Sequence, residues 1–420
     1  MEDPGIKQDI NPSGVEVELG VVDEGTKTLT AEQQSTLNTF RNQVQDVLKP
    51  DHDDNFLLRW LRARNFDLTK SEEMLRNSLI WREKHNVDTI LEDFESPDVV
   101  KKYFTGGTSG FDKEGCPIWV DPLGRLDFKG LMASVGHKDL LLHKLSDLER
   151  FSKVMADQSN KLGKLIDKET IIYDMEKVGM RHLWKPGIDT FNQFVTLVED
   201  NYPERLKFIF IINAPKIFPV IWKLVRPFVA EGTRKKIKVF GTTNYTDTLL
   251  KYIDADQLPA AYGGTLVDKL GDPRCGEMIV QGGEVPKELY ANADSLERDK
   301  FTSVTVGSKQ LLDLDYNVTI PESVLSWQFF TEGYDVGFAV YKRIQEGLQK
   351  GNMEEIVTPE RVTSHIYPGD GSVVCKTVGT YVVRFDNTYS WTRGKKILYS
   401  VDVMAPDSMD GFSNVDICTN

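Results

Sequence analysis

Cysteine is scarce in this chain of 420 residues, and its scarcity bears on redox chemistry and on metal binding. The four cysteines, Cys116, Cys275, Cys375 and Cys418, are widely separated and form no Cys-x-x-Cys pair. Such spacing gives neither a disulfide scaffold nor a zinc-finger signature. Because the acidic N-terminus also carries no secretory signal, we expect reduced thiols and a cytoplasmic protein.

Motifs of catalysis are missing as well. The chain has no Gly-x-Ser-x-Gly, no Walker loop, no Gly-x-Gly-x-x-Gly after a strand and no His-Glu-x-x-His. The six histidines are dispersed, and we interpret His137 and His143 as solvated side chains rather than metal ligands. Residues 106–110 are interpreted as a turn, and Asp174 as the cap of a turn after a strand. We therefore predict no enzyme activity, no cofactor and no metal.

Long apolar runs are also absent, since none approaches the roughly 18 residues of a membrane-spanning helix. A formal net charge of −13 argues against bulk nucleic-acid binding, so any electropositive function has to be local. Residues 216–238 supply such a charge, with seven Lys/Arg against the single acid Glu231 and bulky apolar residues between them. Two interpretations stay open: docking at an anionic membrane surface, or a buried helix followed by a solvated basic turn.

Hydrophobic periodicity divides the rest of the chain into regions. Residues 1–29 are acidic and poor in large apolar groups, which predicts a disordered leader. Residues 30–95 predict a small helical domain, because Thr30-x-x-Gln33 and Thr69-x-x-Glu72 are capping boxes followed by helical spacing.

Residues 96–275 alternate between strand and helix patterns, which predicts an α/β layer with parallel strands. The expected strands are 117–120, 170–173, 208–212 and 237–240, and the expected helices are 138–158 and 186–200.

The last part of the chain changes to period-two alternation. Tyr381, Val383 and Phe385 begin a pattern that predicts an antiparallel β-sandwich over 300–405. Turns are expected at Asp370-Gly371 and Arg393-Gly394. Residues 276–299 resemble a linker and 406–420 a tail, so the whole chain is predicted to be a multidomain α/β protein.

Bulky apolar residues are unusually frequent in the α/β layer. They either fill an ordinary core or line a cavity that a helix at 216–230 closes, and composition leaves both open. A lipid tail of roughly 16 methylenes loses about 13 kcal/mol on exposure to water, so a lipid carrier has to enclose it. The candidate lining residues are Trp119, Ile171, Tyr173, Ile209, Ile211, Phe218, Trp222, Val225, Phe228, Ile237 and Val239.

Several sequence blocks carry a family resemblance. The blocks are 56–67, 171–174, 201–205, 212–215, 216–238 and 258–264, followed by 325–330 and 381–389. In this order the first six resemble the CRAL-TRIO lipid-transfer family, and the last two resemble a GOLD β-sandwich. The resemblance implies a helical N-terminal domain, an α/β lipid-binding domain with a mobile gate helix near 216–230, and a C-terminal GOLD domain.

The resemblance also concerns charged residues. Glu204 and Lys236 match positions that form a charged pair near the inositol headgroup in phosphoinositide-carrying relatives. Glu169 and Ile171 depart from that pattern, because those relatives have small hydroxyl residues there. Since a carboxylate repels a phosphate and isoleucine donates no hydrogen bond, we expect a neutral, mostly apolar ligand.

Three functions are compared. The leading hypothesis is a carrier of a tocopherol, retinoid, squalene-like isoprenoid or phospholipid, with Phe218, Trp222 and Phe228 contacting the bilayer or the tail. Arg234, Lys235 and Lys236 would then attract anionic lipids during transient contact with membranes. The second hypothesis is a lipid-responsive adaptor that recruits a protein through the GOLD domain. The third is a lipid-modifying enzyme, which the missing motifs disfavour.

Overall fold

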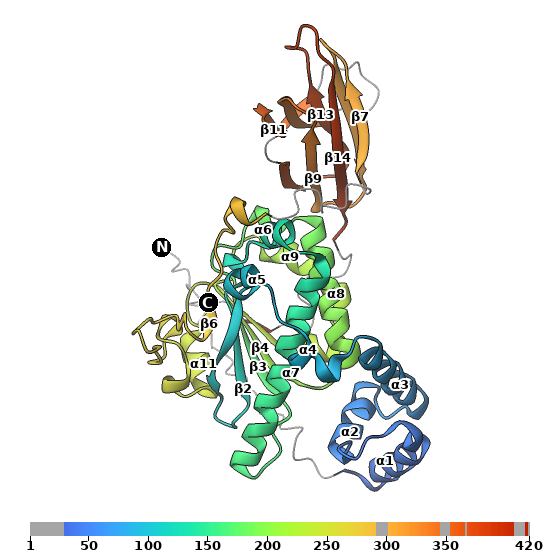
Figure 1. The fold of residues 1–420 in the computed structure, drawn as a ribbon, viewed down its shortest axis with the longest axis vertical. Coiled ribbons are helices and arrows are strands. Elements are labelled where there is room, and N and C mark those ends of the chain that lie inside the picture. The colour runs from blue at the N-terminus through green and yellow to red at the C-terminus, as the bar shows by residue number, and fades with distance from the viewer. Residues whose placement is uncertain (1–28, 291–300, 345–352, 366–367, 407–415, 419–420) are drawn as a thin grey trace, which may run out of the picture. The chain divides into compact units, whose positions relative to one another are not determined.

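The computed structural model describes residues 29–290, 301–344, 353–365, 368–406 and 416–418, and Figure 1 shows the fold. The chain divides into two compact units, Met1–Glu72 and Glu73–Asn420. The helical domain expected at 30–95 therefore continues past the end of the first compact unit. The leader predicted for 1–29 lies outside the described residues except for its last position.

The first unit contains α1 (Ala31–Gln43), α2 (Asp54–Ala63) and the start of α3 (Leu68–Lys84). The capping box at Thr30 and Gln33 is confirmed, with both hydrogen bonds 3.1 Å long. The box predicted at Thr69 is wrong as a helix start, because α3 begins at Leu68. Asp67 Oδ1 accepts the first-turn hydrogen bond from the Lys70 amide instead.

The second unit is built on a seven-stranded sheet with the order β15-β5-β4-β3-β2-β1-β6. Strands β2 to β5 and β15 run parallel, while β1 pairs antiparallel with β2 and with β6. The strands are β1 (Gly106–Phe111), β2 (Pro117–Asp121), β3 (Glu169–Asp174), β4 (Leu206–Ile212), β5 (Ile237–Phe240), β6 (Ile279–Val280) and β15 (Asp416–Cys418). The predicted parallel α/β layer is therefore confirmed.

The structure differs from three expectations at the edges of this sheet. The turn expected at 106–110 is strand β1, in which Gly107 lies against β6. A Cβ on Gly107 would meet the Met278 carbonyl oxygen at 2.1 Å, so only glycine permits this pairing. The linker expected at 276–299 begins inside the sheet with β6, and 291–300 lies outside the described residues. The tail expected at 406–420 contains β15, which pairs with β5.

Helices cover both faces of the sheet (Figure 1). One face carries α7 (His137–Leu162), α8 (Lys185–Asn201) and α9 (Phe218–Val225), and the other carries α11 (Thr246–Tyr252). The remaining α-helices are α4 (Ile90–Asp93), α5 (Asp98–Tyr103), α6 (Phe128–Ser134) and α10 (Glu231–Arg234). Short 3-10 turns are η1 (Gln45–Val47), η2 (Val87–Thr89), η3 (Leu123–Arg125), η4 (Met180–His182), η5 (Arg226–Phe228), η6 (Ala255–Gln257), η7 (Ala260–Tyr262) and η8 (Lys287–Leu289).

The C-terminal part forms two four-stranded antiparallel sheets, with the orders β11-β10-β13-β8 and β12-β9-β14-β7. The strands are β7 (Thr302–Val306), β8 (Leu311–Val318), β9 (Ser323–Thr331), β10 (Val336–Arg343), β11 (Met353–Val362), β12 (Gly369–Cys375), β13 (Gly379–Asp386) and β14 (Lys395–Met404). Buried aromatic rings, among them Phe329, Phe338 and Phe385, join the two sheets into one core. The predicted sandwich is therefore confirmed.

The turn predicted at Asp370-Gly371 is wrong, because both residues lie within β12. Gly371 pairs with Trp327 of β9, and a Cβ on the glycine would stand 2.5 Å from Trp327 Cζ2. The glycine thus makes room for a cross-strand aromatic ring rather than for a change of chain direction. The loop at Arg393-Gly394, between β13 and β14, is confirmed.

Candidate functional site

Two rows of side chains cross the parallel strands β2 to β5. By the strand register, the first row is Trp119, Ile171, Ile209 and Ile237, and the second is Asp121, Tyr173, Ile211 and Val239. Side chains two residues apart on a strand point to the same face, so both rows share one face of the sheet. This face, which we call the row face, is the one beneath α7, α8 and α9. It brings together every predicted lining residue that lies on a strand.

Burial differs between the two faces most clearly on β2 and β3, since Phe208 of β4 on the α11 face is also half-buried. On the α11 face, Ile118, Ile172 and Phe210 are 0% exposed. On the row face, Trp119, Ile171, Tyr173 and Ile209 are only half-buried, although helices cover them. A side chain beneath a helix keeps accessible surface only where there is room for water beside it, whereas close-packed interiors leave almost none.

The large apolar side chains of helix α8 are also incompletely buried. Its sequence is rich in large apolar residues, yet the buried residues of the helix are Thr190 and Asn192. The rings of Phe191 and Phe194 are only half-buried. An amphipathic helix that packs tightly on a sheet buries its apolar stripe first, so α8 does not press its large side chains into a filled core.

Helix α9 closes one end of the row face. Phe218, Trp222 and Val225, which we call the inner stripe, are buried in one cluster with Ile211, Ile237 and Val239. The rings of Phe218 and Trp222 stack with centroids 6.4 Å apart. Among the described residues, the buried indole N–H of Trp222 has no hydrogen-bond acceptor. The inner stripe covers the β4–β5 side of the row face, and the half-buried residues lie on β2, on β3 and, with Ile209, on β4.

Phe228 does not line the row face, and its placement there from the sequence is wrong. The ring is 46% exposed. The reason is local: α9 ends at Val225, and a 3-10 turn with Pro227 at its centre follows over Arg226–Phe228.

A buried carboxyl group lies at the end of the second row. Asp121 is 3% exposed, and burial raises its pKa. Lys144 of α7 places its Nζ 3.7 Å from Asp121 Oδ2 and 4.9 Å from the centre of the Trp119 ring. Asp121 Oδ1 has no hydrogen-bond partner among the described residues. Hydrogen bonding by Thr105 and Trp119 nevertheless opposes the rise in the pKa of Asp121, so these two side chains lie close enough to act on the carboxyl.

A second buried carboxyl group begins β3. Burial raises the pKa of Glu169 to about 7, and the positive charge of Arg205 opposes this rise. Burial also lowers the pKa of Arg205, whose guanidinium lies 4.9 Å from the centre of the Tyr202 ring. At neutral pH the Glu169 site is therefore close to half protonated.

The charged pair implied by the resemblance is present. Lys236 Nζ lies 3.4 Å from Glu204 Oε2, and both side chains are about a quarter exposed. Lys235 forms a 2.8 Å ion pair with Glu231, which neutralises part of the basic segment. Arg234 is half-buried.

Two polar groups outside the row face have structural roles. Asp174 caps the turn as predicted, since its Oδ1 accepts hydrogen bonds from the Glu176 amide (2.9 Å) and from Asn213 Nδ2 (2.8 Å). His143 is not solvated as predicted, because its Nδ1 lies 2.8 Å from Ser96 Oγ and burial lowers its pKa to about 4. No group of three His, Cys, Asp or Glu side chains suited to a metal occurs in the described part of the chain.

Sequence reasoning missed a second apolar side of α9. Ile217, Val220, Ile221 and Leu224, which we call the outer stripe, belong to a cluster with residues of the β-sandwich. The signal was available, since a helix that is apolar on nearly all sides is covered on more than one side.

Two family models match this chain. Residues 27–77 match the CRAL/TRIO N-terminal domain, and residues 101–264 match the CRAL/TRIO domain. The relative "Protein real-time" of Aedes aegypti is 33% identical over 413 residues; the match covers 90% of this chain and 62% of that protein. The crystal structure of Sfh5 is similar with a TM-score of 0.47 and 15% identity, over 63% of this chain and 96% of that one.

Within the described ranges, none of the helices is both long and apolar enough to cross a membrane. The two C-terminal sheets are consistent with a GOLD domain. Through its two matched domains, the chain belongs to the CRAL/TRIO family of lipid-binding and lipid-transfer proteins.

Proposed function

We propose that this protein encloses one mostly apolar lipid against the row face and carries it between membranes. The observation that carries the proposal is the unequal burial of adjacent residues on one strand. Ile172 is 0% exposed, whereas its neighbour Ile171 keeps accessible surface beneath the helices. Space of this kind inside an apolar wall costs stability unless something fills it. A lipid tail fills it and is itself shielded from water.

The chemistry of the row face favours a neutral ligand. Between Glu169 and Asp121 the rows present aromatic and aliphatic side chains and the single hydroxyl of Tyr173. Both carboxyl groups are buried, and burial raises both pKa values, so the site disfavours another negative charge. The Asp121 carboxyl, on which Thr105 and Trp119 also act, can hydrogen-bond one hydroxyl group of a ligand through Oδ1. Tocopherol or retinoid alcohols fit this description best, followed by squalene-like isoprenoids, with phospholipids last.

Exchange with a membrane requires α9 to move, because its inner stripe closes the β4–β5 side of the row face. Phe228 is exposed directly after α9 and is suited to enter the interfacial region of a bilayer. Arg234, Lys235 and Lys236 follow it and favour anionic lipids by roughly 1 kcal/mol each when unpaired. We further propose that the protein is cytoplasmic and contacts anionic membranes transiently.

The test is ligand identification. The purified chain is extracted with organic solvent and examined by mass spectrometry, and the delipidated chain is offered α-tocopherol, retinol, squalene and phosphatidylinositol in vesicles. We expect one bound apolar lipid per chain and vesicle-to-vesicle transfer of the same lipid. A chain that carries nothing and takes up none of the four contradicts the proposal.

A lipid-responsive adaptor is the second candidate, and one observation on the sandwich favours it. Trp391, between β13 and β14, is 80% exposed, and Lys309 Nζ lies 4.5 Å from its ring centre. Exposed tryptophan beside a cation is typical of a contact surface for a partner. Replacing Trp391 by Ala should then remove a protein partner and leave lipid uptake unchanged. Retention of every partner by the variant would count against the adaptor.

We further propose that the chain catalyses no reaction. Asp174, the acid at the carboxyl end of β3, is 1% exposed and is held by Glu176, Asn213 and Tyr262. A carboxylate with these bonds has no free oxygen position facing a substrate. Turnover of a bound lipid that disappears in Asp174→Asn, with lipid uptake retained, would contradict this.

A further inference from the structure

The outer stripe of α9 is covered by the β-sandwich of the same chain. The cluster that contains Ile217, Val220, Ile221 and Leu224 also contains Val324 of β9, Val374 of β12 and Met404 of β14. Val324 is 0% exposed, and Leu224 is 6% exposed. Because α9 also buries its inner stripe in the α/β domain, the helix is held between two apolar surfaces.

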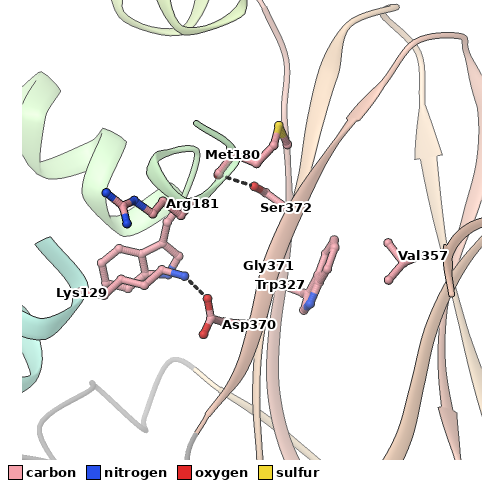
Figure 2. A pocket seen from close by; sticks show the side chains of 9 residues that line it. Lys129, Met180, Arg181, Trp327, Val357, Asp370, Gly371 and Ser372 are labelled. Atoms are coloured by element: carbon pink, nitrogen blue, oxygen red, sulfur yellow. Dashed lines mark hydrogen bonds and ion pairs between the residues drawn. The ribbon is translucent and has the colours of Figure 1, made fainter. Parts of the chain in front are cut away.

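Polar contacts flank this apolar cluster. Lys223 of α9 forms an ion pair with Glu322, the residue just before β9. Lys129 of α6 forms a second ion pair with Asp370 of β12, and Ser372 Oγ donates a 2.9 Å hydrogen bond to the Met180 carbonyl (Figure 2). Each polar contact joins a residue of the α/β domain to a residue at the end of the sandwich.

A pocket interrupts the seam between the two domains. It has a volume of about 360 Å³ and lies beside the Lys129–Asp370 pair (Figure 2). Its lining residues are Lys129, Met180, Arg181, Trp184, Trp327, Val357, Asp370, Gly371 and Ser372. A seam with a gap and flanking ion pairs resembles a transient interface rather than a continuous core, so it can open without unfolding either domain.

We propose that the β-sandwich is a latch on the gate helix: it occupies the outer stripe of α9 and has to release it before α9 can enter a bilayer. This inference rests on the proposed function, in which α9 moves during lipid exchange. The same apolar side chains cannot be buried against the sandwich and in lipid at once. Sandwich and membrane therefore compete for the outer stripe, and the latch keeps a loaded carrier closed in solution.

The competition sets a quantitative expectation. If the sandwich releases α9 only in a minor fraction of molecules, the rate of lipid transfer is reduced by that fraction. Weakening the latch raises the open fraction, and transfer then becomes faster in proportion. Replacing an opposite-charge pair across the seam by a like-charge pair should destabilise the closed state by about 1.4 kcal/mol. This energy corresponds to an increase of about 10-fold in the open fraction.

The decisive variant is Glu322→Lys, which places two lysines opposite each other across the seam. Glu322 is half-exposed, so the change leaves the sandwich core untouched. The matched control is Glu332→Lys, which also breaks a lysine pair (with Lys396, at 2.8 Å) and lies just beyond the other end of β9. The double variant Lys223→Glu with Glu322→Lys reverses both charges and should restore the ion pair. A further variant, Val374→Asp, weakens the apolar part of the same seam.

Two readouts are measured on the full chain: amide hydrogen exchange of 218–225, and transfer of α-tocopherol between phosphatidylserine-containing vesicles. We expect Glu322→Lys and Val374→Asp to raise both rates about 10-fold, Glu332→Lys to match the wild type, and the double variant to restore it. Unchanged exchange rates in Glu322→Lys and Val374→Asp, with both variants folded, would overturn the latch.

The two readouts separate the latch from the function on which it rests. If the chain binds no lipid, transfer is lost in every variant, but hydrogen exchange of α9 still reports whether the sandwich holds it. If the chain transfers lipid but the α9 amides of the variants exchange at the wild-type rate, the proposed carrier function is supported and the latch is contradicted.

Discussion

Adjacent residues on one strand experience two different interiors in this protein. Ile172 of β3 faces α11 and is 0% exposed, and Ile171 faces α7 to α9 and stays accessible. Residue type does not distinguish them, since both are isoleucines covered by helices. This difference indicates that the α11 face of the sheet is a close-packed core that stabilises the fold, whereas the row face leaves room for a ligand.

The β-sandwich extends the comparison. Its core resembles the α11 face, because Phe329, Phe338 and Phe385 interlock at centroid distances of 4.7 to 5.6 Å. Among the described residues, the half-buried row face therefore lies between two tightly packed cores, that of the α11 face and that of the sandwich. A general looseness of the chain would not leave two such tight cores beside it.

The largest expected effect is a difference in the free energy of unfolding between alanine variants of Ile172 and Ile171. Ile172→Ala should lower the free energy of unfolding by about 3–4 kcal/mol, because it opens a cavity in a packed core. Ile171→Ala should cost roughly 1 kcal/mol, because its side chain already borders open space. Urea unfolding of both variants, freed of lipid, gives the two values. Equal losses would erase the distinction between the faces.

The stability of the chain as a function of pH tests the burial of Glu169 at the edge of the row face. The pKa of Glu169 rises from 4.5 to about 7 on folding, so the folded chain keeps a proton that the unfolded chain releases. The contribution of this group is most favourable below pH 4.5 and falls as pH rises to about 7, by about 3 kcal/mol in total.

Glu169→Gln should therefore remove this fall and leave the chain more stable than the wild type at pH 8. Denaturant unfolding between pH 4.5 and 8 measures it, with the exposed Glu83→Gln as a control that follows the wild-type profile. A Glu169→Gln profile parallel to the wild type would show that the carboxyl is ionised in the fold.

Phe228 should contribute to membrane binding and not to the stability of the fold. Phe228→Ser removes roughly 1–2 kcal/mol of apolar burial in a bilayer, which weakens vesicle binding about 5–30-fold. Unfolding should be unchanged within ~0.5 kcal/mol, since the ring is exposed. Leu270→Ser is the control, because Leu270 is 82% exposed and lies far along the chain from the gate. Equal vesicle binding by both variants would remove Phe228 from the membrane contact.

The smallest effect is expected at the charged pair. Lys236→Gln breaks a partly exposed ion pair with Glu204, which is worth under about 1 kcal/mol of stability. Uptake of α-tocopherol should change less than about 2-fold, because a neutral lipid has no charge for Lys236 to balance. A loss of uptake confined to phosphatidylinositol would instead identify an anionic headgroup at this pair.

The sequence predicted the strands and rows well, because their apolar periodicity is set by the side chains themselves. Tyr173 and Ile211 fall on one face by alternation alone. It did not reveal the unequal burial, since Ile171 and Ile172 are the same residue type and only the packing of helices distant in sequence separates them. Gly107 and Gly371 were mistaken for turn residues, because glycine also permits a close neighbour within a strand, and that neighbour is distant in sequence.

The most direct test of the row face is to fill it. Ile171→Trp adds a large side chain where the account places room for a ligand, so uptake of α-tocopherol should fall at least about 10-fold while the free energy of unfolding changes by less than ~1 kcal/mol. If Ile171→Trp instead destabilises the chain by about 3 kcal/mol and leaves uptake intact, the row face is a filled core and the account is contradicted.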